Sequence, residues 1–206
     1  AGENLLTPNS PPAQDCDRVA SCISMACILI FYATGEGHTA RIAERIALGL
    51  KDKGHTAQTH QVDAAGADAL PDFAAYDAVM VGASIHYGRH PRFLRTLVRR
   101  HCSALAGRPG AFFSVSLSAG GPGAKPAAAQ RYLDKFVSET GWRPQQSASF
   151  AGALQYSKYG AIKRLAMIAF VGLAGGNTDT SSDYEYTDWN AVERFTDAFA
   201  MLLKQA

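Results

Sequence analysis

Cysteines are few in this sequence, and none of them has the spacing that metal ligands usually have. The chain of 206 residues has cysteines only at positions 16, 22, 27 and 102, and no two of them form a Cys-x-x-Cys pair. They therefore predict neither a zinc site nor a disulfide framework, and we expect no bound metal. Cys27 and Cys102 lie in a predicted strand and a predicted helix, where buried free thiols fit a reducing, intracellular compartment.

Long apolar runs are also missing, as are acidic residues in the middle of the chain. No segment approaches the roughly 20 apolar residues that span a bilayer, so we expect a cytoplasmic protein or one held peripherally at the inner face of a membrane. The formal net charge is only +2, and no nucleic-acid partner is expected. Between Asp77 and Asp134 there are eight basic residues and no acidic one. This region is either an ordinary solvated face or a surface that attracts an anionic ligand or membrane.

The first 24 residues differ in composition from the rest. Residues 1–24 are rich in Pro, Asn and Ser, and they lack both hydrophobic periodicity and the apolar core of a signal peptide. We expect a disordered N-terminal extension there. Residues 25–206 are long and apolar enough to form one domain around a single core.

Apolar runs alternate with helical periodicity along residues 25–206. The apolar runs predict strands at residues 26–33, 56–62, 77–84, 110–117 and 147–154. The predicted helices are the one that carries Ile42, Ile46 and Leu50 and ends at Gly54, and those at residues 91–105, 126–140 and 187–203, the last capped by Thr187. This alternation indicates an α/β fold with a parallel sheet, helices on both faces, and a ligand site outside the carboxyl ends of the strands.

The segment Thr34-Gly-Glu-Gly-His-Thr39 connects the first strand to the first helix. Its two glycines leave backbone N–H groups accessible, and Thr34 and Thr39 supply hydroxyls. Because a helix N-terminus carries unpaired N–H donors and the positive end of the helix dipole, the segment predicts a phosphate site. The alternative is an ordinary glycine-rich turn.

Two more loops are predicted at the same edge of the sheet. Residues 84–90 include Tyr87, which offers a planar surface to a conjugated ring, and Gly88, which permits close approach; the alternative is a surface aromatic on a turn. Residues 116–121 supply small side chains and backbone groups. One phosphate loop beside two loops that can hold a ring suits FMN better than a dinucleotide.

Several separated motifs resemble known families. Thr34, Gly37 and Thr39 match the flavodoxin phosphate loop Thr-x-Thr-Gly-x-Thr, whereas Glu36 replaces its middle threonine. Four further motifs resemble the menaquinone-dependent protoporphyrinogen dehydrogenase family, and they are Gly82–Gly88, Ala151–Tyr156, Gly175–Thr180 and Tyr186–Trp189. The resemblance runs from about Met25 to the C-terminus.

The resemblance implies a flavodoxin-like, doubly wound sheet of five parallel strands in the order 2-1-3-4-5, with a long insertion at about residues 155–186. It implies FMN as cofactor and oxidation of protoporphyrinogen IX to protoporphyrin IX in haem biosynthesis, with electrons passed to a membrane quinone. The cofactor-binding positions that it implies are Thr34, Gly35, Glu36, Gly37, His38, Thr39, Ser84, Ile85, His86, Tyr87, Gly88, Ser116, Leu117, Ser118, Ala119, Gly120 and Gly121. Glu36 is expected to face solvent, so that backbone N–H groups contact the phosphate.

Roles in substrate handling are open at this point. His86 and Tyr87 are candidates for proton handling or stacking, but hydrogen bonding within a turn is an equal alternative for His86, and no essential acid or base is assigned. The arginines in the range 89–100 are candidates to attract porphyrin propionates. Residues 161–173 predict an apolar helix with Lys163 and Arg164 at its start, which either lies at a membrane interface or packs on the core.

Three other functions remain as alternatives: a one-electron flavodoxin carrier, an FMN-dependent NAD(P)H:quinone reductase, and a flavin or porphyrin chaperone. The arginines and the long insertion are evidence against a carrier, because carriers usually present an acidic face around the flavin. Rapid flavin reduction by NADPH is the observation that would favour the reductase.

Overall fold

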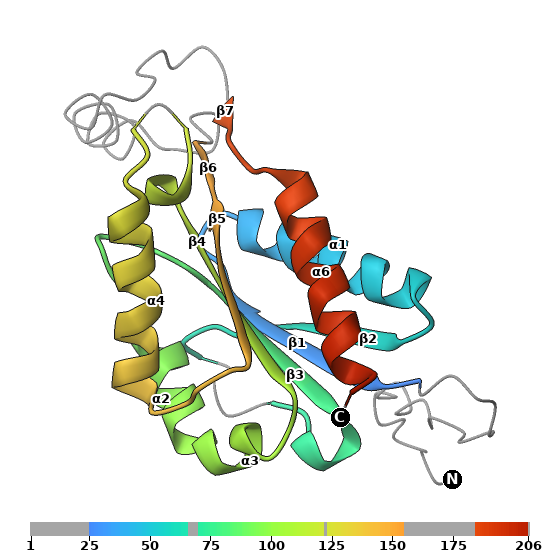
Figure 1. Cartoon of the computed structure of the whole chain (residues 1–206). Helices are drawn as coiled ribbons and strands as arrows, with labels where there is room; N and C mark the ends of the chain where they lie inside the picture. The colour runs from blue at the N-terminus through green and yellow to red at the C-terminus, as the bar shows by residue number, and fades with distance from the viewer. Residues whose placement is uncertain (1–24, 66–69, 122, 155–183, 206) are drawn as a thin grey trace, which may run out of the picture.

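The computed structural model describes residues 25–65, 70–121, 123–154 and 184–205, and they form a parallel sheet with helices on both faces (Figure 1). The strands are β1 (Cys27–Ala33), β2 (Thr56–Gln61), β3 (Ala78–Ser84), β4 (Gly110–Ser116), β5 (Gln146–Ala151), β6 (Ala153–Leu154) and β7 (Tyr184–Glu185). The helices are α1 (His38–Asp52), α2 (Arg92–Arg100), α3 (Cys102–Ala106), α4 (Pro126–Thr140) and α6 (Trp189–Leu203), with short 3-10 turns η1 (Phe73–Ala75) and η2 (Leu117–Ala119).

The strand order of the main sheet is β2-β1-β3-β4-β5, and every neighbouring pair is parallel. In the centre, Ile30 of β1 is in register with Thr59 of β2 on one side and Met80 of β3 on the other. The predicted fold class and strand order are therefore confirmed. The order reverses between β1 and β3, so the loops that follow these two strands flank the switch point where ligands bind in open α/β sheets.

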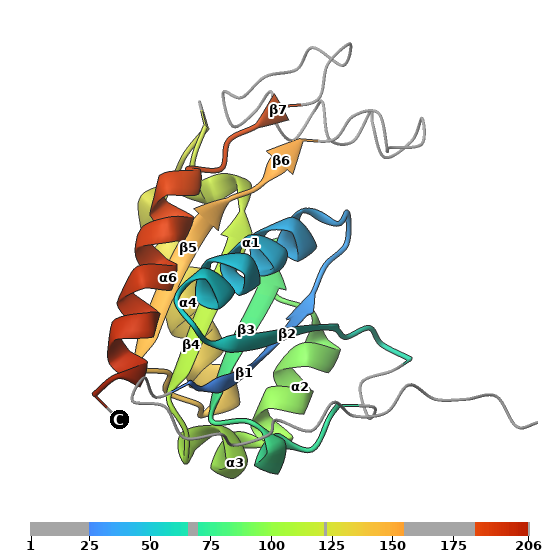
Figure 2. The ribbon, with the colours of Figure 1, turned by 90° about the vertical axis from the view of Figure 1, so that its right-hand side faces the viewer.

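Residues of β1 alternate between two hydrophobic cores, one on each face of the sheet. Ile28 and Ile30 belong to the core beneath α1 and α6, whereas Leu29 and Phe31 belong to the core beneath α2, α3 and α4. All seven residues of β1 are buried, as expected for a strand covered on both sides. Figure 2 shows α1 and α6 together on one side of the sheet.

The predicted helix at residues 91–105 is wrong in one respect, because two helices occupy this range. α2 ends at Arg100, His101 has backbone angles outside the helical region (φ −103°, ψ 16°), and α3 begins at Cys102. The ring of His101 lies against that of Phe73, with centroids 5.2 Å apart. Apolar periodicity continues across the break, so the sequence pattern gives no sign of it.

The last predicted strand, residues 147–154, also differs from the structure. The main sheet ends with Ala151, Gly152 follows, and β6 then pairs antiparallel with β7 in a separate two-stranded sheet. This small sheet lies beyond the carboxyl end of β5 (Figure 1). β7 and Tyr186 are thus the described end of the predicted insertion.

Thr187 was expected to cap the last helix, and this expectation is wrong. Asp188 is the N-cap residue, and its carboxylate accepts a hydrogen bond from the backbone N–H of Ala191 (3.1 Å). Threonine and aspartate are both good N-cap residues, so adjacent candidates cannot be ranked from sequence. The Thr187 hydroxyl makes other contacts, which belong to the site below.

Several expectations fall on residues outside those that the structure describes. They are the disordered extension at 1–24, Cys16 and Cys22, most of the predicted insertion including 161–173, and the motif Gly175–Thr180.

Candidate functional site

The loop between β1 and α1 is built to leave the first turn of α1 open. Gly37, the residue before the helix, has φ +87°, a conformation that favours glycine. The backbone N–H of Gly37 donates to the Thr34 hydroxyl (2.9 Å), which fixes the loop. No side-chain hydrogen bond caps α1, and its first turn holds no acidic residue. The N-terminal N–H groups of α1 and the positive end of its dipole are therefore suited to an anion.

Thr39 provides the strongest sign of a ligand at this helix end. Its side chain is buried, yet within the described residues its hydroxyl has no hydrogen-bond partner. A buried hydroxyl without a partner costs free energy, which an additional hydrogen-bond partner would offset. A phosphate oxygen fits, because it accepts from a hydroxyl and from backbone N–H groups together. Glu36, expected to face solvent, is half-buried.

A two-residue turn presents Tyr87 at the end of β3. His86 and Arg89 exchange backbone hydrogen bonds in both directions (2.9 and 3.1 Å), and the two residues between them, Tyr87 and Gly88, have φ +50° and +73°. A positive φ is unusual for tyrosine and is found where the surroundings enforce it, often at functional sites. Tyr87 is 99% exposed. A large aromatic ring held in this way is available for stacking on a conjugated ligand.

His86 connects the Tyr87 turn to the phosphate loop. Its Nε2 lies 3.0 Å from the Ser84 hydroxyl, and a Cβ atom on Gly35 would overlap its ring. Gly35 is thus required where the two loops approach each other. Of the three roles considered for His86, the structure contains the hydrogen bond within the turn. Proton handling and stacking by His86 stay predictions.

His90 anchors the Tyr87 turn from below. It is buried, its Nε2 lies 2.9 Å from the Ser114 hydroxyl of β4, and the rings of Phe112 and Phe136 pack edge-on to it with centroids 5.4 and 5.2 Å away. Burial, assisted by the charges of Arg95 and Lys135, lowers the pKa of His90 to about 3. His90 is therefore neutral at physiological pH and serves as a packing and hydrogen-bonding residue.

The third predicted loop follows β4 and packs against the end of the insertion. Ser116 is buried and, within the described residues, its hydroxyl has no hydrogen-bond partner, as with Thr39. Leu117, Ser118 and Ala119 form η2. A Cβ on Gly120 would lie 2.7 Å from Cβ of Ala151, and a Cβ on Gly121 would lie 2.9 Å from the ring of Tyr186. Both glycines are therefore needed for this close approach.

Some of the predicted cofactor-binding residues connect the loops through their backbone. Ile85 connects the second and third loops, because its backbone N–H donates to the Val115 carbonyl (2.8 Å). The backbone carbonyl of Ser118 accepts from Lys125 (2.8 Å), which closes the third loop onto α4. Tyr186 and Thr187 also reach this edge, although Thr187 was expected only as a helix cap and Tyr186 only as part of the motif Tyr186–Trp189. The described parts of all three predicted loops thus lie at one edge of the sheet, the carboxyl end of β1, β3 and β4.

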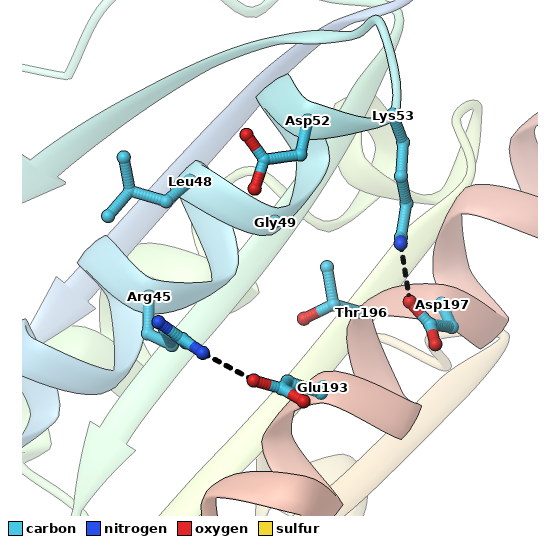
Figure 3. A pocket seen from close by; sticks show the side chains of 8 residues that line it. All are labelled: Arg45, Leu48, Gly49, Asp52, Lys53, Glu193, Thr196 and Asp197. Carbon is cyan, nitrogen blue, oxygen red and sulfur yellow. Dashed lines mark hydrogen bonds and ion pairs between the residues drawn. The ribbon is translucent and has the colours of Figure 1, made fainter.

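A separate groove lies between α1 and α6, away from these loops. It has a volume of about 250 Å³ and is bridged by ion pairs between Arg45 and Glu193 and between Lys53 and Asp197 (Figure 3). Four of its five charged side chains are paired with one another, and Asp52 is the fifth. Among the described residues there is no group of three or more His, Cys, Asp or Glu side chains placed to hold a metal.

Comparisons with known proteins agree with this geometry. A family model described as a flavodoxin domain matches residues 29–181. A protoporphyrinogen IX dehydrogenase [quinone] of Escherichia coli (strain K12) is 34% identical over 177 residues, which are 84% of this chain and 94% of the relative. A protein with the same name from Leishmania major is 37% identical over 174 residues, which are 84% of this chain and 74% of the relative.

Among solved structures, the rubredoxin oxygen:oxidoreductase of Desulfovibrio gigas matches with a TM-score of 0.50 at 14% identity, over 87% of this chain and 36% of that one. At this identity the match concerns the fold alone. The sequence matches are much stronger, and they extend over most of the chain and most of the relatives. The chain therefore belongs to the family of flavodoxin-domain proteins that includes the quinone-dependent protoporphyrinogen IX dehydrogenases.

Proposed function

We propose that this protein is an FMN-dependent dehydrogenase that oxidises protoporphyrinogen IX to protoporphyrin IX and passes the electrons to a quinone. The observation that carries the proposal is the buried Thr39 hydroxyl at the open end of α1, which lies on the same sheet edge as the Tyr87 turn. The names of the relatives supply the substrate and the acceptor. The flavin would supply the hydride chemistry. The residues of this chain therefore have to bind the cofactor, orient it toward the substrate and shield it from water.

The residues of the three loops divide these tasks. Residues 34–39 hold the phosphate through the N–H groups of α1 and the Thr39 hydroxyl. Residues 84–88 and 116–121 would hold the isoalloxazine ring, Tyr87 by stacking and Ser116 through its hydroxyl. The neutral His90 and the glycines at 35, 120 and 121 keep these loops in place.

The overall reaction is a transfer of hydrogen from the porphyrinogen to the quinone. Each two-electron cycle removes two hydrogens from the substrate and converts one quinone to a quinol, and protoporphyrinogen IX needs three such cycles. His86, beside Ser84, is the residue that we propose to accept or relay a proton at its Nε2.

The arginines in the range 89–100 differ in how they are engaged within the chain. Arg95 is paired with Glu139 (2.5 Å). Arg89 and Arg92 are exposed and lie at the start of this region, nearest the Tyr87 turn. We propose these two as the propionate-binding residues, because a guanidinium can bind a carboxylate through two hydrogen bonds.

A membrane quinone requires access to a bilayer. None of the helices in the part of the chain that the structure describes has the length and apolar character needed to cross a membrane. We propose peripheral contact at the inner face of a membrane, made by the apolar segment 161–173, which lies outside the described residues.

The test is anaerobic stopped-flow absorbance on the FMN-reconstituted protein. Mixing with protoporphyrinogen IX should bleach the oxidised flavin band rapidly, and menaquinone should restore it. Bleaching by NADPH alone would instead identify a quinone reductase.

Substitution of Thr39 tests the cofactor site separately. Thr39→Ala should weaken FMN binding by about tenfold to a hundredfold, because a hydrogen bond to a charged group contributes about 1.5–3 kcal/mol. Thr39→Ser, which keeps the hydroxyl, is the matched control. Binding can be followed by quenching of flavin fluorescence, and equal affinities for FMN in Thr39→Ala and wild type would remove Thr39 from the site.

A further inference from the structure

The segment from Tyr184 to Trp189 lies between two of the proposed cofactor loops. The backbone N–H of Tyr186 donates to the Gly152 carbonyl (3.2 Å), and that of Gly152 donates to the Ser116 carbonyl (3.2 Å). On the third loop, the Tyr186 ring packs against Gly121 at a distance that leaves no room for a Cβ atom. This segment therefore supports the third loop in two ways, through Gly152 by backbone hydrogen bonds and directly by the Tyr186 ring.

On its other side the segment reaches the first residue of α1. The Thr187 hydroxyl donates to the Ala151 carbonyl (2.8 Å) and lies 2.6 Å from Nε2 of His38. A hydroxyl has a single proton, and the carbonyl can only accept. His38 Nε2 must therefore carry a proton and donate it to Thr187. This fixes the orientation of a buried imidazole at the open end of α1.

A second set of contacts joins the same two elements at the surface. Arg41 of α1 pairs with Glu185 (2.7 Å) and lies over the Trp189 ring, and the Trp189 indole N–H donates to Glu185 (2.8 Å). Although burial alone would raise the pKa of Glu185, its hydrogen bonds with Arg41 and Trp189 lower it. The Arg41 side chain is 50% exposed, so this outer contact is weaker than the buried one.

We infer that His38 is a positioning residue that couples the phosphate end of the cofactor site to its third loop. Through Thr187, His38 fixes residues 186 and 187, and Tyr186 in turn fixes Gly120 and Gly121 beside the flavin ring. A ligand with a phosphate is held by α1 and so favours the arrangement in which His38 meets Thr187. The inference rests on the proposed FMN site and adds that phosphate binding orders the loop at the far end of the cofactor.

The test compares FMN with riboflavin, which has the same ring but no phosphate. In wild type, FMN should bind more tightly than riboflavin, and FMN alone should slow hydrogen–deuterium exchange in residues 184–189. Thr187→Val keeps the shape of the side chain and removes the hydroxyl. It should lower the preference for FMN over riboflavin by about tenfold and abolish the FMN-specific protection. Thr187→Ser should retain both.

Thr196→Val is the matched control, because the Thr196 hydroxyl is also buried and donates to a carbonyl, that of Val192 (2.8 Å), but has no contact with His38. It should leave the flavin preference unchanged. The variants His38→Ala and Thr187→Val should have effects that do not add when combined, since they break one connection.

An unchanged preference in Thr187→Val, or an equal loss in Thr196→Val, would overturn the inference while leaving FMN binding intact. Failure of wild type to bind either flavin would instead contradict the proposed function. Circular dichroism on each variant confirms folding, and His38→Gln, which keeps an N–H donor, gives a second measurement if Thr187→Val does not fold. Retained FMN preference and protection in His38→Gln support the coupling, and a preference as low as that of His38→Ala overturns it.

Discussion

Both faces of the sheet have an apolar core with aromatic contacts, but they differ in what lies beside that core. Under α2 and α4, Phe112 and Phe136 stack with ring centroids 3.9 Å apart, and both contact the neutral His90 at the end of the Tyr87 turn. Under α1 and α6, Phe113, Phe150 and Phe195 are in contact within the core, and the two helices are also joined at their outer rim by exposed ion pairs across a groove. Buried aromatic packing stabilises far more than exposed charge pairs do.

This difference matters for the site. The turn that carries Tyr87 continues directly into His90, so the face under α2 and α4 anchors the loop proposed to hold the ring. The other face contributes the N-terminus of α1, where the Thr39 hydroxyl and the first backbone N–H groups are suited to bind a ligand. The hollow between α1 and α6 is the more visible feature, yet four of its five charged side chains are paired across it. At the proposed functional edge the distinguishing features are the buried hydroxyls of Thr39 and Ser116, which have no partner among the described residues, and the positive φ of Tyr87, rather than a hollow.

The largest expected effect comes from the face under α2 and α4. Phe136→Ala should lower the free energy of unfolding by about 3–5 kcal/mol, because it empties a fully buried site. It should also speed amide exchange at Arg89, whose N–H closes the Tyr87 turn. The matched control is Phe199→Ala on α6, equally buried on the other face. In guanidinium titrations Phe199→Ala should lower the free energy of unfolding by a similar amount. Once this loss of global stability is taken into account, amide exchange at Arg89 should be as slow as in wild type. Equally faster exchange at Arg89 in both variants would contradict the comparison.

The second-largest effect is expected from His90, as a pH-dependent contribution to the free energy of unfolding. Its pKa is about 3 in the folded protein and about 6.5 when unfolded, so between these values the unfolded chain binds more protons. The contribution of His90 to the free energy of unfolding is fully present above pH 6.5. As the pH is lowered from 6.5 toward 3, this contribution falls by about 1.4 kcal/mol per pH unit.

Carboxylates also titrate on acidification, so the measurement is the difference between wild type and His90→Gln in urea titrations from pH 5 to 7. The variant should be less stable at pH 7, and its stability should fall less steeply as the pH is lowered. Identical slopes would show that His90 is accessible to protons in the folded protein.

The smallest effect is expected at the rim between α1 and α6. Arg45→Gln breaks the pair with Glu193, in which both side chains are about half exposed, and should change stability by about 0.5 kcal/mol or less. Affinity for FMN should not change. Unfolding of the wild type and of this variant at low and high salt provides the measurement, and a loss above about 1 kcal/mol would mean that the groove is held together by its ion pairs.

Local sequence patterns were sufficient for most of the elements. Ile42, Ile46 and Leu50 recur at helical spacing and are all buried, and the apolar runs of β1, β3 and β4 are buried strands. Gly54 and Gly141 follow α1 and α4 with positive φ, as helix-ending glycines do. The phosphate loop was readable for the same reason: glycines, hydroxyls and a helix start are neighbours in the chain.

The sequence by itself thus determined the fold, its strand order through family resemblance, and which loops meet at one edge. Only the tertiary structure decided how distant side chains share their hydrogen bonds. Thr187 does not cap α6 because Ala151 and His38 engage its hydroxyl, and α2 ends where His101 meets Phe73. Backbone preferences act between near neighbours and leave a pattern in the sequence. Contacts between residues far apart, 149 positions for His38 and Thr187, depend on packing and leave none.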